Sequence, residues 1–348
     1  MAKKTKHKRL TEIVKTAEKF FKQPVLNVTA PGGKGRASYR LNMQDRSVIG
    51  TLRPNFRRTH LEAYVLQNLS RHNDDVPQCL GIVGNVLFQS DVGERRLNVE
   101  ISRHKTSEQI DLADHAIAAI FRYQNAAKLT TLDENLPHLG ANNKWVEQFV
   151  NSADALAQYL DQDTIPFDRA AACQEIAQPG LLFVKWDCRS GNAAIDQFER
   201  LRWFDFEYCG LRHGAEDFAW LIGDESLPLK PEIMLDIVQD NFDASNGHEK
   251  NAYFDFLSLY LAFHCVQRLK LIVKEAKKRG WLSKHRVLKY DDAGVHPAFA
   301  AHICEVGSYF AVRNAISAPL APFFEAAQNV FEDILAGSSS AIPETNAA

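Results

Sequence analysis

The spacing of apolar residues changes along the chain. In residues 11–21 and 59–69, apolar positions recur every three or four residues, as on one face of an amphipathic helix. Runs with strand-like composition lie at residues 25–28, 38–41, 47–52 and 82–89, with turns expected around Gly81 and Gly84. A glycine-rich break at residues 32–35 separates the first two runs. This first part of the chain therefore predicts an N-terminal helix followed by a small antiparallel sheet with one helix.

From residue 106 onward the pattern is mostly helical. Thr106 and Gln109 form a capping-box sequence that opens a long amphipathic segment, and residues 145–160 form another. Short strands and turns at residues 181–206 interrupt the helices, which then resume to Leu335. The pattern predicts a two-lobed α+β protein. Its parts would be an N-terminal helix or arm (1–22), a β-rich small lobe (23–93), a mostly helical large lobe (94–336) and a disordered tail (337–348).

Composition narrows the possible partners. The chain has 348 residues, of which 45% are apolar and 24% charged, and its formal net charge is −2. These values are typical of a globular protein and give no global argument for nucleic-acid binding. The basic residues 3–9 are the local exception, and we expect a solvated terminus there rather than a nucleic-acid arm.

Cysteine usage and hydropathy indicate a cytoplasmic protein without a membrane partner. The six cysteines form no Cys-x-x-Cys pair, and no apolar segment follows the basic start. The most apolar stretch, residues 254–273, contains Asp255, His264, Arg268 and Lys270. A membrane span needs about twenty residues nearly free of charge, so we expect a buried core helix.

Candidate chemistry is concentrated between residues 185 and 207. Asp187 and Asn192 lie in a predicted loop between two apolar runs, and a further apolar run ends at Asp205. Short strands would bring an acid, an amide and a second acid to one place. A carboxylate can accept a hydroxyl proton, and amide and carboxylate oxygens are suitable magnesium ligands. Glu207 could bind a second magnesium ion, position substrate or lie at the surface. Spacing alone leaves ordinary turn residues as an alternative, because Asp and Asn favour turns.

These residues resemble the catalytic loop of the aminoglycoside phosphotransferase and choline kinase-like family, which has a protein-kinase-like fold. The family pattern is an aspartate, four residues, an asparagine and a later strand that ends in a second aspartate; here these are Asp187, Asn192 and Asp205. Residues 214–219 resemble a further family motif in which Asp217 supports the loop. The resemblance implies an enzyme that transfers the γ-phosphate of ATP or GTP, with Mg²⁺, to a small-molecule hydroxyl. Asp187 would be the base, and Asn192 and Asp205 would hold the metal.

The β-rich region resembles the family's nucleotide-binding lobe. Residues 31–35 resemble the loop that covers the nucleotide, where glycine N–H groups approach phosphates. Residues 48–53 resemble the strand that carries a phosphate-binding lysine, with Arg53 in that place. The nucleotide-binding residues that the resemblance implies are Gly32, Gly33, Lys34, Gly35, Arg53 and its partner Glu62.

Three departures from the family pattern keep a second hypothesis open. Lys185 replaces a histidine that organises the loop backbone, Trp186 replaces a glycine, and Arg53 replaces the lysine. A nucleotide-binding pseudokinase that acts as a scaffold is therefore the alternative, although retention of all three polar residues favours catalysis. The short interval between Asp205 and Asp217 disfavours a protein kinase. The sequence leaves the acceptor (an aminoglycoside, choline, a sugar, homoserine or another hydroxyl compound), the choice of ATP or GTP and the oligomeric state open.

Overall fold

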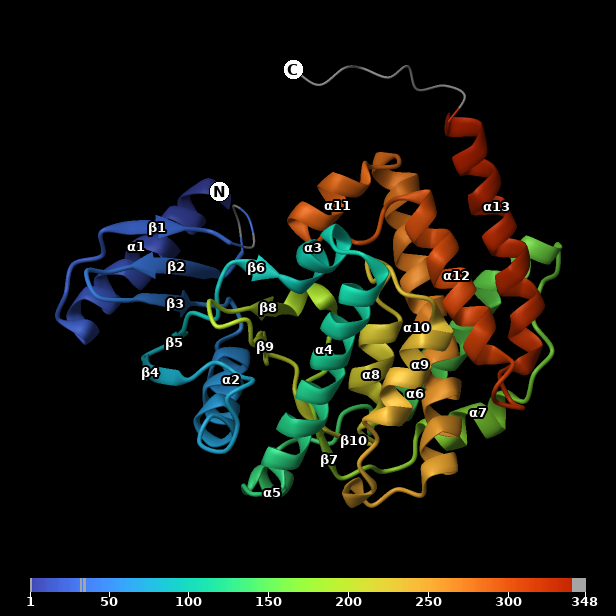
Figure 1. Cartoon of the computed structure of the whole chain (residues 1–348), viewed down its shortest axis with the longest axis horizontal. Coiled ribbons are helices and arrows are strands. Elements are labelled where there is room, and N and C mark those ends of the chain that lie inside the picture. Colours follow the sequence, from blue (N-terminus) through green and yellow to red (C-terminus); the bar gives the residue numbers. More distant parts are fainter. Residues whose placement is uncertain (1, 32, 34–35, 340–348) are drawn as a thin grey trace. The chain divides into compact units, whose positions relative to one another are not determined.

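An N-terminal antiparallel sheet followed by a largely helical region forms an α+β fold, which confirms the predicted fold class (Figure 1). A computed structural model describes residues 2–31, 33 and 36–339. The chain divides into two compact units. The first comprises residues 1–103, 111–138 and 180–217, and the second comprises residues 104–110, 139–179 and 218–348.

Five antiparallel strands form the main sheet of the first unit, in the order β1–β2–β3–β5–β4. The strands are β1 (Asn27–Thr29), β2 (Ser38–Asn42), β3 (Ser47–Thr51), β4 (Cys79–Val83) and β5 (Val86–Ser90). Between β3 and β4 lies helix α2 (Phe56–Leu69). The chain turns at Gly84, which has a φ of 58°, as the sequence predicts. The left-handed backbone at this glycine makes the tight β4–β5 connection possible.

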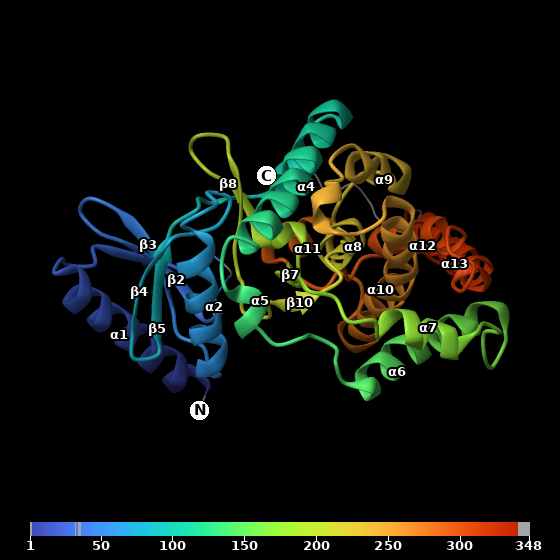
Figure 2. The same ribbon diagram turned by 90° about the horizontal axis from the view of Figure 1, so that it is seen from below.

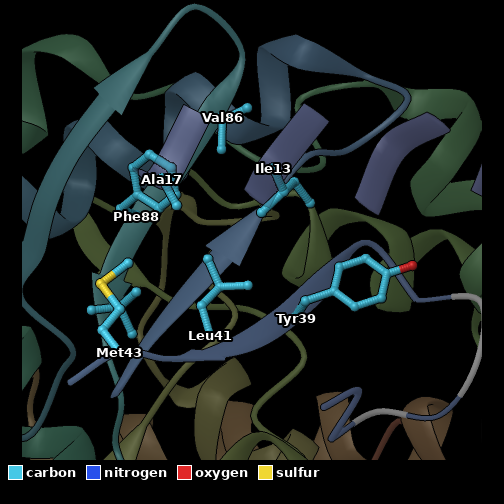
Figure 3. Packing of buried hydrophobic residues seen from close by; sticks show 8 residues of the cluster. Ile13, Ala17, Tyr39, Leu41, Met43, Val86 and Phe88 are labelled. Carbon is cyan, nitrogen blue, oxygen red and sulfur yellow. The ribbon is translucent and has the colours of Figure 1, made fainter. Parts of the chain in front are cut away.

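Helix α1 (Ala2–Phe21) packs along one face of this sheet (Figures 1 and 2). Its buried residues Ile13 and Ala17 join a cluster with strand residues that include Leu41 and Phe88 (Figure 3). The helix approaches closely at Gly50, where a Cβ atom would lie 2.7 Å from Cγ2 of Ile13. The sequence predicts an N-terminal helix or arm at residues 1–22, and helix α1 packs there into the core of the sheet.

Residues 180–217 belong to the same compact unit as the sheet. Short strands β6 (Arg95–Arg96), β8 (Ala193–Ile195) and β9 (Leu201–Trp203) form one small sheet, and β7 (Leu182–Val184) pairs with β10 (Gly210–Arg212). The buried indole of Trp203 donates a 3.2 Å hydrogen bond to the carbonyl of Ala116 on α4 (Thr106–Ala127). The unit also contains α3 (Leu97–Glu100), η1 (Ile101–Arg103), α5 (Leu132–Asn135) and η3 (Ser190–Asn192). The division into units therefore does not coincide with the lobe boundary expected after residue 93.

The second unit is helical. Its elements are α6 (Asn143–Asn151), η2 (Ser152–Leu160), α7 (Arg169–Ile176), the end of α8 (Ala215–Ile222), α9 (Pro231–Asp240), η4 (Ala244–Asn246), α10 (Lys250–Arg279), α11 (Lys284–Tyr290), α12 (Pro297–Ala311), η5 (Ala318–Leu320) and α13 (Ala321–Ser339). The single helix expected at residues 145–160 is thus an α-helix followed by a 3₁₀ segment. Helix α13 includes the first three residues of the expected tail, and residues 340–348 lie outside the described part.

Helix α10 contains the most apolar stretch of the chain. By length and composition it is apolar enough to cross a membrane, the one such helix among the described residues. However, 78% of its apolar window is buried inside the structure. The charged Arg268 on this helix is also buried, and its Nη2 atom lies 2.6 Å from Oε1 of Glu225. Helix α10 is buried against α6, α7, η2 and α12, so it is a core helix of the second unit.

Replacement of Ile13 by alanine tests whether α1 is part of the sheet's core. We expect Ile13→Ala to lower the free energy of unfolding by about 2–5 kcal/mol, because it leaves a cavity beneath a fully buried position. The exposed Lys15→Ala on the same helix is the matched control and should leave stability unchanged. Urea denaturation followed by fluorescence measures both. Equal midpoints for Ile13→Ala and the wild type would contradict the docking of α1.

Candidate active site

The loop that carries Asp187 has a strained backbone. Residues 185–192, here called the Asp187 loop, connect β7 to β8 and end in η3. Trp186 and Asp187 have φ values of 59° and 51°, in the left-handed region that non-glycine residues rarely adopt. Such a conformation costs about 1–3 kcal/mol for each residue and persists only where the surroundings enforce it.

Hydrogen bonds to Asp217 help to hold this left-handed backbone in place. Its fully buried carboxylate accepts hydrogen bonds from the backbone N–H groups of Lys185 and Trp186, both at 2.8 Å, and from the Tyr123 hydroxyl at 2.7 Å. Burial raises the pKa of Asp217, and these three donors oppose the rise. Asp217 therefore contacts the backbone just before Asp187.

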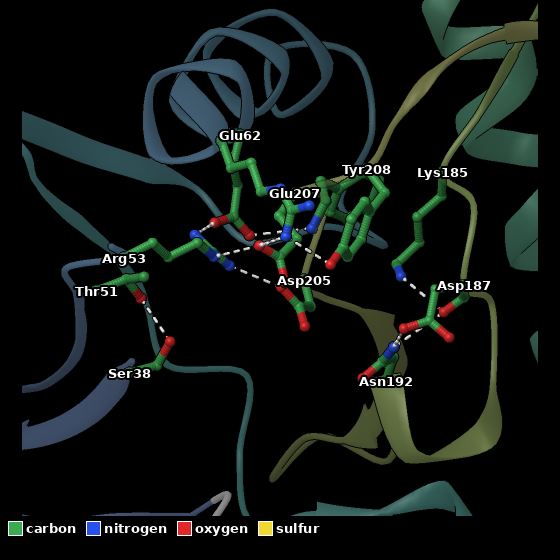
Figure 4. Close-up of polar contacts among 12 residues, drawn as sticks. Ser38, Thr51, Arg53, Glu62, Lys185, Asp187, Asn192, Asp205, Glu207 and Tyr208 are labelled. Carbon is green, nitrogen blue, oxygen red and sulfur yellow. Dashed lines mark hydrogen bonds and ion pairs between the residues drawn. The ribbon is translucent and has the colours of Figure 1, made fainter. Parts of the chain in front are cut away.

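The Asp187 carboxylate is held by two neighbours and remains partly accessible. Oδ1 accepts a 2.8 Å hydrogen bond from Nε of Arg189. Oδ2 accepts one of 3.0 Å from the Asn192 amide (Figure 4). The same amide nitrogen lies 2.9 Å from the carbonyl of Asp187. The Asp187 side chain is 23% exposed, so an incoming hydroxyl can reach its oriented carboxylate.

Asn192 and Asp205 lie at the same end of the β8–β9 hairpin. Ala193 pairs with Trp203, and the next N–H, of Phe204, donates to the carbonyl of Asn192 at 2.9 Å. Asp205 follows directly, with a φ of 65° and a side chain that is 34% exposed. The hairpin register therefore brings the two predicted metal ligands to neighbouring chain segments.

The donor set fits a magnesium ion shared with a phosphate ligand. Within the ranges that the structure describes, no group of three or more His, Cys, Asp or Glu side chains could hold a metal ion. Mg²⁺ usually keeps several waters and binds one or two carboxylates together with substrate phosphates. One buried amide, that of Asn192, and one partly exposed carboxylate, that of Asp205, correspond in type to the ligands of such a shared site.

Arg53 forms ion pairs with three carboxylates. It lies two residues beyond β3, and its Nη1 atom is 2.5 Å from Oε2 of Glu62 on α2. Nη2 is 2.7 Å from Oδ1 of Asp205, and Nε is 2.9 Å from Oε2 of Glu207 (Figure 4). Burial by itself lowers the pKa of Arg53, but the charges of the three acids outweigh it and raise the pKa. The predicted partner Glu62 thus contacts Arg53, together with two acids that the sequence did not connect to it.

Glu207 lies inside this charged cluster. Burial and the nearby charge of Asp205 raise the pKa of Glu207, whereas Arg53 and Arg58 lower it. Arg58 also donates a 2.6 Å hydrogen bond to the hydroxyl of Tyr208 and lies over its ring at 4.2 Å. Of the alternatives left open for Glu207, the structure favours a position beside the site over a surface role.

The glycine-rich segment connects β1 to β2, as the sequence predicts. Gly33 has a φ of 89°, and its N–H donates to the carbonyl of Ala30 at 2.9 Å. A residue with a side chain would be strained there. Gly32, Lys34 and Gly35 lie outside the described residues.

Sequence reasoning missed the parts of this site that arise from side-chain contacts. Tyr123 and Arg58 come from helices far from residue 187 in sequence, and no motif marks them. The contact of Arg189 with Asp187 could have been predicted from the sequence, because a cation two residues after a proposed base is close enough to contact it. Cys188 is fully buried, and burial raises the pKa of its thiol well above the ordinary value, so it is not an activated nucleophile.

Similarity to known proteins is found in structure and not in sequence. No protein-family model matches the chain, and no curated protein matches its sequence. Solved structures of aminoglycoside phosphotransferases and choline kinases match across most of the chain. Spectinomycin phosphotransferase in complex with ADP and spectinomycin is 10% identical, with a TM-score of 0.49 over 91% of this chain and 98% of that one.

Two further matches are similar in extent. Choline kinase from Streptococcus pneumoniae is 12% identical, with a TM-score of 0.44 over 84% of this chain and 99% of its own. An aminoglycoside-3'-phosphotransferase of type VIII is 15% identical, with a TM-score of 0.47 over 72% of this chain and 98% of its own. With TM-scores below 0.5 and such low identities, these likenesses establish neither activity nor substrate.

Removal of the Arg53 guanidinium tests the charged cluster without any assumption about function. We expect Arg53→Met to lower the free energy of unfolding by about 3–5 kcal/mol, because Glu62 is fully buried and would lose its cation. Arg46 forms an exposed pair with Asp45, so Arg46→Met is the control and should have no measurable effect. Chemical denaturation of both variants decides the question. A wild-type midpoint for Arg53→Met would show that the cluster contributes nothing to stability.

Proposed function

We propose that this protein is a phosphotransferase that moves the γ-phosphate of ATP or GTP to a hydroxyl of a small molecule. The observation that carries the proposal is the placement of Asp187, Asn192 and Asp205. The Asn192 amide contacts Asp187, and the β8–β9 hairpin brings Asp205 to the same end, next to Arg53. A base, two metal ligands and a phosphate-binding cation are the groups that in-line phosphoryl transfer needs.

The oriented carboxylate of Asp187 accepts the proton of the acceptor hydroxyl while the hydroxyl oxygen attacks the γ-phosphorus. The bond from that phosphorus to the bridging oxygen breaks, and the nucleoside diphosphate leaves. Asn192 and Asp205 would hold Mg²⁺, which supplies neutralisation of phosphate charge when bound. Arg53 binds the α- and β-phosphates through its several N–H donors and is kept in place by Glu62.

Structural features favour a small acceptor and a cytoplasmic setting. The residues between Asp205 and Asp217 form a turn, strand β10 and the first residues of α8, which leaves no room for a long peptide-binding segment. All six cysteines are free thiols, as is usual for proteins in a reducing compartment. A panel of metabolites assayed for release of the nucleoside diphosphate identifies the acceptor.

One observation favours the second candidate, a nucleotide-binding pseudokinase that acts as a scaffold. Arg53 forms an ion pair with Asp205, so the proposed metal ligand is already neutralised by a cation. In the catalytic proposal, phosphates and Mg²⁺ compete successfully for Arg53 and Asp205. In the scaffold proposal this pair persists, and nucleotide binds without magnesium.

Substitution of Asp187 tests the base. We expect Asp187→Asn to lower turnover by about 10²–10⁴-fold, because the amide cannot accept the hydroxyl proton, and to leave nucleotide affinity within about twofold. The exposed Asp133→Asn serves as the control for loss of one acid. Steady-state release of nucleoside diphosphate with the best acceptor from the panel measures turnover. If Asp187→Asn retains more than about half of the wild-type rate, Asp187 is not the base.

Asp205 distinguishes the two candidates. With the wild type, we expect ATP to raise the melting temperature only when magnesium is present. With Asp205→Ala, we expect this stabilisation by ATP and magnesium to vanish. Thermal unfolding with ATP, with and without MgCl₂, provides the measurement. Equal stabilisation of wild type and Asp205→Ala by MgATP would refute the metal assignment. Stabilisation of the wild type by ATP alone, without turnover on any acceptor, would favour the scaffold.

A further inference from the structure

Lys185 is a lysine buried in an unusual environment. Its side chain is fully buried at the end of β7, where lysine is rarely found. The ammonium group lies 3.3 Å from the carbonyl oxygen of Asp187 and 3.5 Å from that of Trp186 (Figure 4). It also lies 5.3 Å from the ring centre of Phe206 and 5.8 Å from that of Trp203, within the range of cation–π attraction.

These contacts are made with the strained part of the Asp187 loop. The two carbonyls that face the ammonium belong to Trp186 and Asp187, the two residues with left-handed backbones. The N–H groups on the other side of the same turn, those of Lys185 and Trp186, are held by Asp217. The turn is therefore held from both sides, with an anion at its N–H groups and a cation at its carbonyls.

Lys185 also connects the Asp187 loop to the segment that carries the proposed metal ligand. Phe206 follows Asp205 directly, and its backbone N–H donates a 3.0 Å hydrogen bond to Oε1 of Glu62. The ammonium over the Phe206 ring thus contacts both segments of the site. An ammonium has three donors and can serve two carbonyls at once, whereas a neutral imidazole has one N–H to donate. The histidine that the sequence resemblance expects here could not make both contacts.

We propose that Lys185 is a positioning residue. Its ammonium fixes the left-handed backbone of Trp186 and Asp187 and thereby presents the Asp187 carboxylate beside Asn192. Because Lys185 is fully buried, its effect on turnover is exerted through the position of Asp187 and not through contact with a substrate. The effect expected on turnover rests on the proposed phosphotransferase function, whereas the effect expected on the loop backbone does not.

Lys185→Met tests the proposal by removing the donors while keeping an unbranched apolar chain in the buried site. Hydrogen exchange measured by mass spectrometry should show faster exchange, by about tenfold or more, in the peptide that covers residues 183–192. The exposed Lys128→Met on the same unit is the matched control and should exchange like the wild type. Lys185→His, which restores one donor, should recover part of the protection. It also replaces Lys185→Met if that variant does not fold.

A kinetic measurement separates positioning from a general structural role. Hydrolysis of MgATP, with water in place of the acceptor, should fall by about 10–10²-fold in kcat for Lys185→Met, with KM within about twofold. In an Asp187→Asn background the same substitution should have little further effect, because the carboxylate that it positions is absent.

The outcomes distinguish this inference from the proposed function. Unchanged exchange in Lys185→Met and Lys185→His would overturn the inference whether or not the protein is a kinase. An equal loss of kcat with and without the Asp187 carboxylate would also overturn it, since Lys185 would then act on the fold in general. A wild type without turnover would refute the proposed function alone, and the exchange result would still decide the role of Lys185.

Discussion

The buried guanidinium of Arg53 is the interaction on which the site depends. It pairs with Glu62 on α2, nine residues further along the chain, and with Asp205 and Glu207 in the distant segment that follows β9. Desolvation of such charges is expensive, and the pairs repay it only if geometry and hydrogen bonding are good. Glu62 meets that condition by accepting both from Arg53 and from the N–H of Phe206. The position of Asp205 is thereby tied to the sheet through a network of charges.

A second network holds the backbone of the Asp187 loop. Two consecutive residues in the left-handed region are unfavourable, and an isolated loop of this sequence would not keep them there. Asp217 and Lys185 contact opposite sides of the turn, with Tyr123 completing the hydrogen bonds of the carboxylate. Strain at the proposed base is thus balanced by buried charges that do not themselves contact a substrate.

The two networks meet at the segment from Asp205 to Glu207. Arg53 holds the carboxylates of this segment, and the Lys185 ammonium lies over the ring of Phe206 between them. In the proposed reaction, a nucleotide and its metal would share Arg53 and Asp205 with the existing ion pair. The free energy gained when phosphate binds Arg53 must therefore exceed the free energy lost when the Arg53–Asp205 ion pair is broken. Because Glu62 and Glu207 also bind Arg53, nucleotide affinity is sensitive to both.

The sequence by itself determined the element types and the order of the polar residues. Helical periodicity located α2 and α4, strand-like runs located β2 and β3, and the spacing of Asp187, Asn192 and Asp205 marked the candidate site. These features are local, since periodicity and turn preference depend on neighbours in the chain. The structure agrees with them because burial of the same apolar faces drives both the pattern and the fold.

Only the tertiary structure decided what lies beside these elements. Contacts between distant segments place α1 in the core of the sheet and residues 180–217 in the same unit. A contact of the same kind joins Arg53 to Glu207. Lys185 shows the difference most clearly. In the sequence it is a departure from an expected histidine, whereas in the structure its ammonium meets two carbonyls of a strained turn. Nothing local to residue 185 specifies that contact, because it requires the buried environment that Phe206 and Trp203 create after the chain has folded.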